Sequence, residues 1–442
     1  MRSRQLAESI CAKLHAAGHQ AWFVGGCVRD LVLGREPADF DVSTDATPAR
    51  VLELFPGSIA VGAQFGVILV VDDSVKVEVA TFRSDVGYSD GRHPDHVVFS
   101  KTPEEDVLRR DFTINGLLMD PRTGEVRDFV GGRADLDAKL IRAIGEPAQR
   151  FAEDKLRMVR AVRFAARLVY TIEPATLAAI QKFAPQVTIV SAERLREELT
   201  KLLTEGAARR GFELLDACGL LAVLLPGIAR MKGVQQPPQF HPEGDVWTHT
   251  LMMLEMLAPG CSATLAWGVL LHDVGKPPTF APPSGPDGRI RFDGHVEVGM
   301  RMAEEICRRF RFSNEDASQI VALVEHHLRF KDAPQMRAST LKRFVRLPRF
   351  DEHLELHRLD CLSSHRMLDN YNFVRRFLEE TPPEQVRPPR LLTGDDLKEL
   401  GLEPGPQFRS LLQAVEDAQL DGRLNSKDEA LEFVRAQLAG RT

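Results

Sequence analysis

The sequence predicts an α+β multidomain protein in which an N-terminal α/β unit precedes domains that are all helical. The chain has 442 residues, and because domains contain roughly 150 residues, about three are expected. Strand signals are confined to roughly the first 130 residues. From about residue 134 onward, amphipathic helical patterns take their place.

The N-terminal unit opens with a helix that is expected from Gln5 and ends at Gly18. Strands rich in β-branched residues are then expected over residues 21–24, 39–43, 66–72 and 75–82. Thr47 and Pro48 predict a further helix, because they have the form of an N-cap followed by proline at the first helical position. This mixture of elements predicts an α/β or α+β unit.

The remainder shows helical periodicity, most clearly over residues 151–168 and 191–203. Proline and glycine interrupt it at 235–244, 276–288 and 381–390. We interpret the first and third interruptions as domain boundaries and the second as a loop within a domain. The expected domains cover residues 1–137, 138–235, 236–365 and 366–442.

The composition excludes several classes of protein. Apolar residues make up 43% of the chain and charged residues 27%, which is typical of globular proteins rather than collagenous, disordered or membrane-spanning ones. The six cysteines lie far apart, so neither a disulfide framework nor a cysteine zinc site is predicted. No apolar run approaches the ~20 residues that cross a bilayer, and we predict a cytoplasmic protein with no membrane partner. The net charge is −6, so a nucleic-acid partner requires a local basic stripe.

The densest chemistry lies directly after the first predicted strand. Gly25 and Gly26 form a turn that lets backbone amides approach phosphates, and Arg29 adds positive charge at the start of a helix. Asp39 and Asp41 are two residues apart, so an extended strand would turn both carboxylates to one side. Such oxygen ligands predict a Mg²⁺ site for in-line displacement at a triphosphate. The alternative is a pair of surface acids near a turn.

Glu78 is the third candidate for a catalytic carboxylate. Val75, Val77 and Val79 occupy one face of its predicted strand, so Glu78 lies on the other face. The alternative for Glu78 is a solvated strand face.

A basic helix supplies the local stripe. Asp154, Arg157, Arg160 and Arg163 recur every three residues and predict a polar ridge, and residues 139–167 hold eight Lys or Arg against three Asp or Glu. An Asp beside an Arg offers an acceptor and a planar donor fork, which suit the Watson–Crick edge of a base. Further arginines would neutralise phosphates. The alternative is a solvated face with i,i+3 ion pairs.

A second group of potential metal ligands lies in the helical part. It comprises His249, His272, Asp273, His295, His326, His327 and Asp360. Imidazole and carboxylate ligands spread over a helical bundle are typical of a catalytic transition-metal site with water in an open position. The chain has 13 histidines, so some of them must have other roles.

The first motif and the segments after it resemble the class II tRNA nucleotidyltransferase and bacterial poly(A) polymerase family. The resemblance extends over a flexible loop at 80–99, a second motif at 108–117, the helix at 151–168 and a C-terminal segment at 391–422. It implies a nucleotidyltransferase head with a polymerase β-like fold. It also implies a helical neck and body that selects the nucleotide and binds RNA, and a helical tail that binds tRNA.

The resemblance implies roles for individual residues. Asp154 and Arg157 would act as a protein template that selects CTP or ATP. The incoming nucleotide would also lie on Gly25, Gly26, Arg29, Arg110, Asp111, Asn115, Arg160 and Arg163. Arg110 could instead be a salt-bridge partner of Asp111. Gly116 departs from the family, many of whose members have alanine there, and the full-length loop from Ser84 to Pro94 favours an enzyme that adds the terminal A.

The His272-Asp273 pair, followed by Val-Gly-Lys-Pro, resembles the HD phosphohydrolase superfamily. The pattern of that superfamily places divalent-metal ligands at His249, His272, Asp273 and Asp360. A two-metal variant would add His295 and one of His326 or His327. Such a domain is either an active phosphohydrolase or an RNA-binding scaffold, and the complete ligand pattern favours the hydrolase.

These resemblances predict template-independent addition of CCA to tRNA 3′ ends from CTP and ATP. Mg²⁺ would serve the head, and a divalent transition metal would serve a hydrolase centre in the HD domain. Within the family, the alternatives are an A-adding-only enzyme and a poly(A) polymerase. From other classes, the alternatives are an HD phosphohydrolase with a degenerate nucleotide-binding head and a non-catalytic RNA-binding protein. No obligate protein partner is evident.

Overall fold

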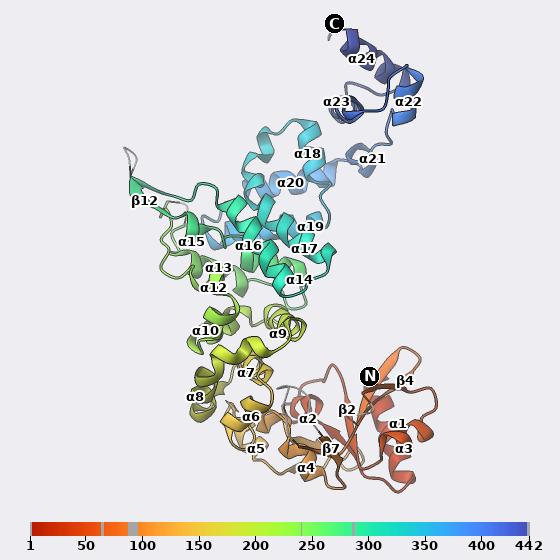
Figure 1. The fold of residues 1–442 in the computed structure, drawn as a ribbon, viewed down its shortest axis with the longest axis vertical. Helices are drawn as coiled ribbons and strands as arrows, with labels where there is room; N and C mark the ends of the chain where they lie inside the picture. The colour runs from red at the N-terminus through yellow and green to blue at the C-terminus, as the bar shows by residue number, and fades with distance from the viewer. Residues whose placement is uncertain (1, 63–65, 87–95, 240, 285–287, 440–442) are drawn as a thin grey trace. The chain divides into compact units, whose positions relative to one another are not determined.

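The computed structural model describes residues 2–62, 66–86, 96–239, 241–284 and 288–439 (Figure 1). The chain forms two compact units, of which the first contains residues 1–229 and 258–260 and the second contains residues 230–257 and 261–442. Most of the predicted flexible loop at Ser84–Pro94 lies outside the described residues. Among the described residues, no helix combines the length and apolar character that a membrane span requires.

A seven-stranded mixed sheet forms the centre of the first unit, in the order β3-β4-β5-β2-β1-β8-β9. Its strands are β1 (Ala21–Val24), β2 (Asp41–Thr44), β3 (Ile59–Gly62), β4 (Val67–Asp72), β5 (Val75–Thr81), β8 (Leu117–Met119) and β9 (Val126–Asp128). The paired strands run antiparallel, except that β2 and β5 run parallel. Helices α1 (Arg2–Ala16) and α3 (Pro48–Leu54) pack against this sheet. The parallel pair matters for the site, because its register sets Asp41 opposite Glu78.

The predicted fold class is confirmed, with local differences. Thr47 caps α3 as expected, since its side chain accepts a hydrogen bond from the backbone N–H of Arg50. The strand predicted over 39–43 begins at Asp41. The sequence did not predict β3, β8 and β9, each of which has only three or four residues. Further short strands are β6 (Arg83–Val86), β7 (His96–Phe99), β10 (Leu140–Ile141), β11 (Thr171–Ile172), β12 (Ala281–Ser284) and β13 (Arg289–Arg291).

Helices make up the rest of the first unit. They are α2 (Gly26–Val32), α4 (Pro103–Leu108), α5 (Gly132–Asp137), α6 (Pro147–Glu153), α7 (Leu156–Leu168), α8 (Pro174–Phe183), α9 (Ala192–Thr204), α10 (Ala208–Ala217), α11 (Leu220–Leu224) and α12 (Pro226–Ala229), with 3₁₀ turns at Thr113–Asn115 and Ala184–Ile189. Helix α7 buries Val159 and Val162 fully and packs against α9 and α10. Its other side remains available for the basic ridge.

The helix predicted over 151–168 is two helices. Asp154 has extended backbone angles, φ −146° and ψ 107°, and separates α6 from α7. Its carboxylate accepts a hydrogen bond from the backbone N–H of Leu156 at 3.0 Å, which satisfies a donor at the start of α7. Asp154 therefore lies at the head of the ridge rather than on its helical surface.

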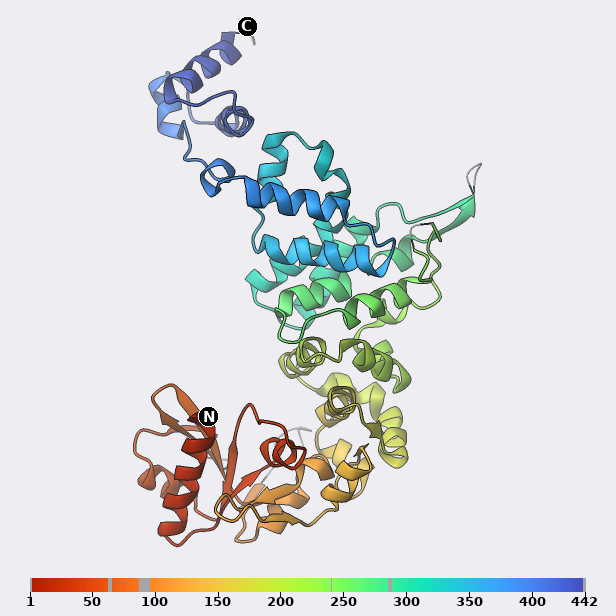
Figure 2. The same ribbon diagram turned by 180° about the vertical axis from the view of Figure 1, so that it is seen from behind.

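The second unit is almost entirely helical. Its helices are α13 (Val246–Glu255), α14 (Ala263–Leu271), α15 (Lys276–Thr279), α16 (His295–Arg309), α17 (Asn314–His326), α18 (Ala338–Phe344), α19 (Phe350–Ser363), α20 (Asp369–Glu380), α21 (Pro383–Val386), α22 (Gly394–Glu399), α23 (Pro406–Leu420) and α24 (Lys427–Ala439), with a 3₁₀ segment at His327–Gln335. Helices α19 and α20 lie side by side, both blue in Figure 2. Helices α13, α14, α17 and α19 pack together, and all the predicted metal ligands of this unit except His295 lie in these helices or directly after them.

Candidate active sites

The first site begins at the turn between β1 and α2. Gly25 has φ 76°, a left-handed conformation that glycine adopts without strain. The guanidinium of Arg29 is buried, donating to Oδ1 of Asp30 at 2.8 Å and to Oδ1 of Asn115 at 2.9 Å. The predicted phosphate turn is thus present, and its arginine is held in one orientation.

Three carboxylates converge beside this turn. Asp41 and Glu78 are register partners on the parallel strands β2 and β5, and Asp39 precedes Asp41. Burial raises the pKa of Asp41 to about 6, with Glu78 and Asp39 adding to the effect and Arg110 opposing it. Asp41 is half-buried, whereas Asp39 and Glu78 are exposed. Carboxylates that repel one another are suited to a divalent cation, because the cation removes the repulsion. The donor set therefore fits Mg²⁺.

Arg110 pairs with Asp106 and not with Asp111, the partner considered from the sequence. Asp106 is fully buried and accepts hydrogen bonds from Arg109 at 2.6 Å and from Arg110 at 2.9 Å. Burial alone would raise the pKa of Asp106, but the two arginines outweigh burial and lower it to about 2. Asp106 thus holds Arg110 at the site as a permanent anion.

Asp111 and Asn115 serve the basic ridge. Oδ2 of Asp111 lies 2.8 Å from Arg160, and Oδ1 accepts from the amide of Asn115 at 3.1 Å. Burial opposes ionisation of Asp111, yet Arg160 and Asn115 lower its pKa to about 2. Four of the predicted nucleotide-binding residues, Arg29, Asn115, Asp111 and Arg160, therefore form one hydrogen-bonded network.

Asp154 and Arg157, the pair that the resemblance predicts to select the base, are also held by neighbours. Arg157 donates to Glu153 at 2.7 Å and to the backbone carbonyl of Arg109 at 2.9 Å. Both carboxylate oxygens of Asp154 accept from Arg194, at 3.2 and 2.7 Å. Ion pairs are thus present on the ridge. Those of Asp154, Arg160 and Arg163 connect the ridge to other elements, and they hold these three side chains in place.

All ten predicted nucleotide-binding residues line one cavity of about 550 Å³ together with Asp39 and Asp41. Nine basic and six acidic side chains border it, and the excess of positive charge suits a triphosphate. Glu78 does not line this cavity. Its place opposite Asp41 still brings it to the carboxylate cluster.

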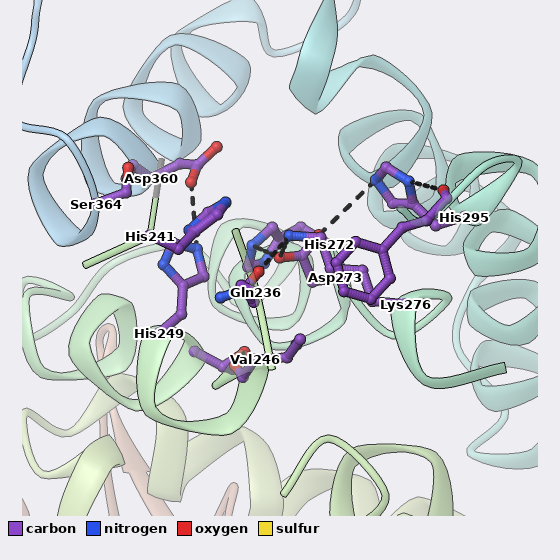
Figure 3. Close-up of polar contacts among 12 residues, drawn as sticks. Gln236, His241, Val246, His249, His272, Asp273, Lys276, His295, Asp360 and Ser364 are labelled. Atoms are coloured by element: carbon purple, nitrogen blue, oxygen red, sulfur yellow. Dashed lines mark hydrogen bonds and ion pairs between the residues drawn. The ribbon is translucent and has the colours of Figure 1, made fainter. Parts of the chain in front are cut away.

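The second site is a cluster of imidazoles and carboxylates inside the second unit (Figure 3). Two groups are built from the predicted ligands, namely His249, His272 and Asp360, and Asp273, His295 and His327, and within each group the ligand atoms lie within 4.8 Å of one another. A third group of this kind, His241, Glu243 and His249, shares His249 with the first. The Nε2 atoms of His249, His272, His295 and His327 are buried and make no hydrogen bond among the described residues. Unpartnered buried nitrogens that converge on carboxylates are the ligand pattern of a metal centre, so the residues fit divalent cations.

Asp273 connects the two groups. Its Oδ2 lies 3.2 Å from Nε2 of His272 and 2.7 Å from Nζ of Lys276, while its Oδ1 lies 3.8 Å from His327 and 4.0 Å from His295. Burial opposes ionisation, but Lys276 and His272 keep the pKa of Asp273 well below its usual range. A carboxylate that faces two groups of ligands is the arrangement needed to bridge two cations.

His249 and Asp360 complete the first of these groups. Nε2 of His249 lies 3.2 Å from Oδ1 of Asp360 (Figure 3). Burial would lower the pKa of His249, but Asp360 and Glu243 outweigh it and raise the pKa to about 9. This surplus of negative charge again suits a cation.

The adjacent histidines of the predicted pair separate. His327 belongs to the group of Asp273, whereas His326 lies against His353 and Phe344, with ring centroids 5.8 and 6.5 Å apart. Among the described residues, His326 is in neither group. Of the two alternatives, we therefore keep His327.

The turn between α14 and α15 is packed against α16 without space for a side chain. A Cβ atom on Gly275 would lie 2.0 Å from the backbone oxygen of His295 and 2.6 Å from the backbone nitrogen of Gly299. Glycine is needed here because of this close approach. The contact seats the first turn of α16, which carries His295, directly on the turn that carries Asp273.

Comparisons with known proteins match the domains in which the two sites lie. Residues 21–142 match the family model described as the poly A polymerase head domain, and residues 170–232 match the probable RNA- and SrmB-binding site of polymerase A. Residues 246–360 match the HD domain. The chain thus contains a poly A polymerase head domain and an HD domain. The predicted recognition, with an HD domain in addition, is thereby confirmed.

Several CCA-adding enzymes are similar over about half of this chain. The CCA-adding enzyme of Levilactobacillus brevis is 44% identical over 216 residues, which is 49% of this chain and 54% of that protein. The CCA-adding enzyme of Geobacillus stearothermophilus is 44% identical over 225 residues, which is 51% of this chain and 55% of that protein. The chain thus spans about half the length of the curated relatives that it matches.

Solved structures of the family match nearly the whole chain. The Bacillus stearothermophilus CCA-adding enzyme in complex with CTP is 26% identical and has a TM-score of 0.75, covering 99% of this chain and 98% of that chain. The Thermotoga maritima CCA-adding enzyme complexed with tRNA is 19% identical with a TM-score of 0.58, covering 98% of this chain and 95% of that chain, and supports the fold alone.

The departure from the family at Gly116 has a local reason. A Cβ atom there would lie 2.7 Å from Cγ2 of Val130, 3.1 Å from Cγ1 of Val107 and 3.3 Å from Cδ1 of Ile144. Alanine would therefore require these side chains to move. In this chain, these three side chains occupy the space that the methyl group of alanine would need at position 116.

The sequence did not predict the residues whose side chains hold the predicted site residues in place. Asp106, Arg194 and Glu198 each pair with a predicted site residue, and Glu243 pairs with His249. Asp106 lies in an ordinary acidic first turn of a helix, and Arg194 and Glu198 lie in an ordinary amphipathic pattern. The signal for Glu243 was its place between His241 and Asp245 in a segment interpreted only as a boundary.

Proposed function

We propose that the chain adds CCA to the 3′ ends of tRNA from CTP and ATP without a nucleic-acid template. The observation that carries this proposal is the cavity that brings the acid pair Asp39 and Asp41 together with the base-selecting pair Asp154 and Arg157. CCA-adding relatives and the structure with CTP support it. Such a role would place the chain in the cytoplasm, with tRNA, CTP and ATP as its partners.

Different residues of the cavity would bind the triphosphate and the base of the incoming nucleotide. Arg110, Arg160 and Arg163 would bind the triphosphate, while Asp154 would accept from the base edge and Arg157 would donate to it. The tRNA 3′-hydroxyl would attack the α-phosphate, and the bond to pyrophosphate would break.

Asp39, Asp41 and Glu78 would hold Mg²⁺, which supplies Lewis-acid activation of the hydroxyl and neutralises charge on the leaving group. The carboxylates themselves would bind and orient these cations on the side of the cavity that faces Gly25 and Gly26. Arg110, held by Asp106, would keep the triphosphate in line with them.

The test uses tRNA transcripts that end at the discriminator base, at C or at CC, with CTP, ATP or both. Exactly three additions from the first transcript would support CCA synthesis. Growth of the CC-ended transcript alone would identify an A-adding enzyme, and a long ladder with ATP alone would identify a poly(A) polymerase. Asp39→Ala with Asp41→Ala should abolish addition while tRNA binding persists, which would exclude a degenerate head.

We also propose that the second unit is a metal-dependent phosphohydrolase. The four unpartnered Nε2 atoms and the bridging position of Asp273 favour this over an RNA-binding scaffold. A cyclic phosphodiesterase assay and a phosphatase assay with Ni²⁺, Mn²⁺ or Mg²⁺ test it. Turnover that His272→Ala removes would support the proposal, and no turnover with any of these metals would leave the scaffold as the better explanation.

A further inference from the structure

His249 differs from the other histidines of the second site in how its ring is held. His272, His295 and His327 each have Nδ1 within 2.7–2.8 Å of the carbonyl oxygen three residues earlier. His249 lies inside α13, where the carbonyl of Val246 already accepts from the hydroxyl of Thr250. The ring of His249 therefore needs another partner.

Glu243 is that partner. Its Oε1 lies 2.7 Å from Nδ1 of His249 and 2.8 Å from Nδ1 of His241. The two rings pack edge to face with centroids 5.0 Å apart (Figure 3). One buried carboxylate oxygen thus orients two neighbouring imidazoles.

The segment that carries Glu243 is tied to its surroundings. The carboxylate of Asp245 accepts from the backbone N–H of Gly233 at 2.6 Å and of Thr248 at 2.8 Å. The N–H of Val246 donates to the carbonyl of Val234 at 3.0 Å. These bonds fix the backbone two residues after Glu243, so its side chain is positioned by the fold.

The hydrogen bonds determine which ring nitrogen carries the proton. A carboxylate only accepts, so Nδ1 of both His249 and His241 must donate, and in the neutral ring the lone pair is on Nε2. Nε2 of His249 faces Oδ1 of Asp360 at 3.2 Å, a place that a proton on Nε2 occupies in the metal-free protein and that a metal cation can take instead. The hydroxyl of Ser363, 3.3 Å from Nδ1 of His249, donates to the carbonyl of Asp360 and leaves this assignment in place.

We propose that Glu243 is a positioning residue of the HD centre, which holds His249 and His241 as Nδ1–H tautomers and so presents Nε2 of His249 to the cation shared with His272 and Asp360. The inference rests on the proposed metal-binding function of the second unit. Carboxylates behind a ligating histidine fix its ring and raise its basicity, and their loss weakens metal affinity about 10- to 100-fold.

The first experiment needs no metal. Long-range ¹H–¹⁵N spectra of the full chain with ¹⁵N-labelled histidine, assigned with His249→Ala and recorded above the pKa of about 9 where the ring is neutral, report the tautomer of His249. We expect the Nδ1–H form in the unsubstituted protein and in Glu243→Gln, which keeps an acceptor oxygen, and a shift toward the Nε2–H form in Glu243→Ala. An unchanged tautomer in Glu243→Ala would overturn the proposal.

The second experiment measures binding of Co²⁺ to the metal-free chain by calorimetry and by visible absorption. Glu243→Ala should weaken Co²⁺ binding about 10- to 100-fold and change the absorption bands, while Glu243→Gln should restore most of the affinity. Glu384→Ala, at an exposed position of the same unit, is the matched control and should match the unsubstituted protein. Affinity for Co²⁺ within twofold in Glu243→Ala would contradict the proposal.

The two experiments separate this inference from the proposed function. If the unsubstituted protein binds no Co²⁺, the metal-binding function fails, and the tautomer of His249 still decides whether Glu243 holds the ring. Thermal unfolding of each variant shows whether it is folded. If Glu243→Ala does not fold, the tautomer and affinity of Glu243→Asp, which moves the carboxylate back by one methylene, decide instead, and unchanged values there would also overturn the proposal.

Discussion

At the residue scale, the ionised carboxylate of Asp41 lowers the stability of the folded, metal-free protein. Burial and the neighbouring carboxylates raise its pKa from 3.8 to about 6, so at neutral pH the folded metal-free protein carries a charge that the unfolded chain solvates better. Asp41→Asn should therefore stabilise the metal-free protein at pH 7.5, by about 1–2 kcal/mol after allowance for partial exposure. The gain should decline as the pH falls through 6 and vanish below 3.8, where the carboxyl is protonated in both states.

Urea unfolding in the presence of a chelator at pH 7.5 and pH 3.5 measures this difference. Asp72→Asn, at an exposed position of the same sheet, is the control and should change the free energy of unfolding little at either pH. A loss of stability in metal-free Asp41→Asn at pH 7.5 would contradict this expectation, because it would show that the ionised carboxylate of Asp41 does not destabilise the folded protein.

Arg194 is a second residue with a specific expected effect. It binds both oxygens of Asp154, so Arg194→Ala should free the carboxylate to rotate away from the base edge. We expect kcat/KM for CTP to fall about 10- to 100-fold, because a hydrogen bond to a charged group contributes about 1.5–3 kcal/mol. Addition of UTP relative to CTP should rise. Arg194→Lys should recover part of the selectivity, and Arg209→Ala on the nearby helix α10 should leave it unchanged.

At the scale of elements, one buried acid pairs with two arginines across the contact between α7 and α9. Glu198 accepts from Arg163 at 2.6 Å and from Arg160 at 3.3 Å and is almost fully buried. Glu198→Ala should destabilise the first unit by about 3–5 kcal/mol, because it leaves Arg163 buried without this partner. Glu197→Ala, at the exposed neighbouring position, should change stability by less than about 0.5 kcal/mol. Chemical denaturation of the two variants compares them directly, and equal stabilities would contradict the expectation.

Elements also show where prediction from sequence succeeds and where it stops. The N-cap at Thr47 was visible, because its chemistry is local. The break at Asp154 was not, because the helical period continues through 151–168 and only the capping bond to Leu156 and the pair with Arg194 stop the helix. The ligands of both sites could be named from their spacing. The residues that hold them could not, because Asp106 and Glu198 reach partners through tertiary packing.

At the scale of the whole molecule, removal of metal should affect the two units differently. Two of the three tryptophans, Trp247 and Trp267, lie on α13 and α14 beside the second site, and Trp22 lies in the first unit. Ni²⁺ at 100 times its dissociation constant should stabilise the second unit by about 2.7 kcal/mol, and EDTA should reverse this. Calorimetric and fluorescence-detected melting measure the shift. His272→Ala should remove it, and an equal shift in that variant would place the metal elsewhere.

The backbone contact at Gly275 sets the distance between the two ligands Asp273 and His295 of the second site. The turn after Asp273 is in backbone contact with the first turn of α16. The distance between Asp273 and His295 is therefore set by the position of the whole helix α16. Metal–ligand distances tolerate only about 0.2 Å. Gly275→Ala would therefore alter one group of ligands and spare the other: the group of Asp273, His295 and His327 should lose its cation, while that of His249, His272 and Asp360 should keep one. A single methyl group would thus convert a centre built for two ions into a centre for one, which metal counting by mass spectrometry can detect.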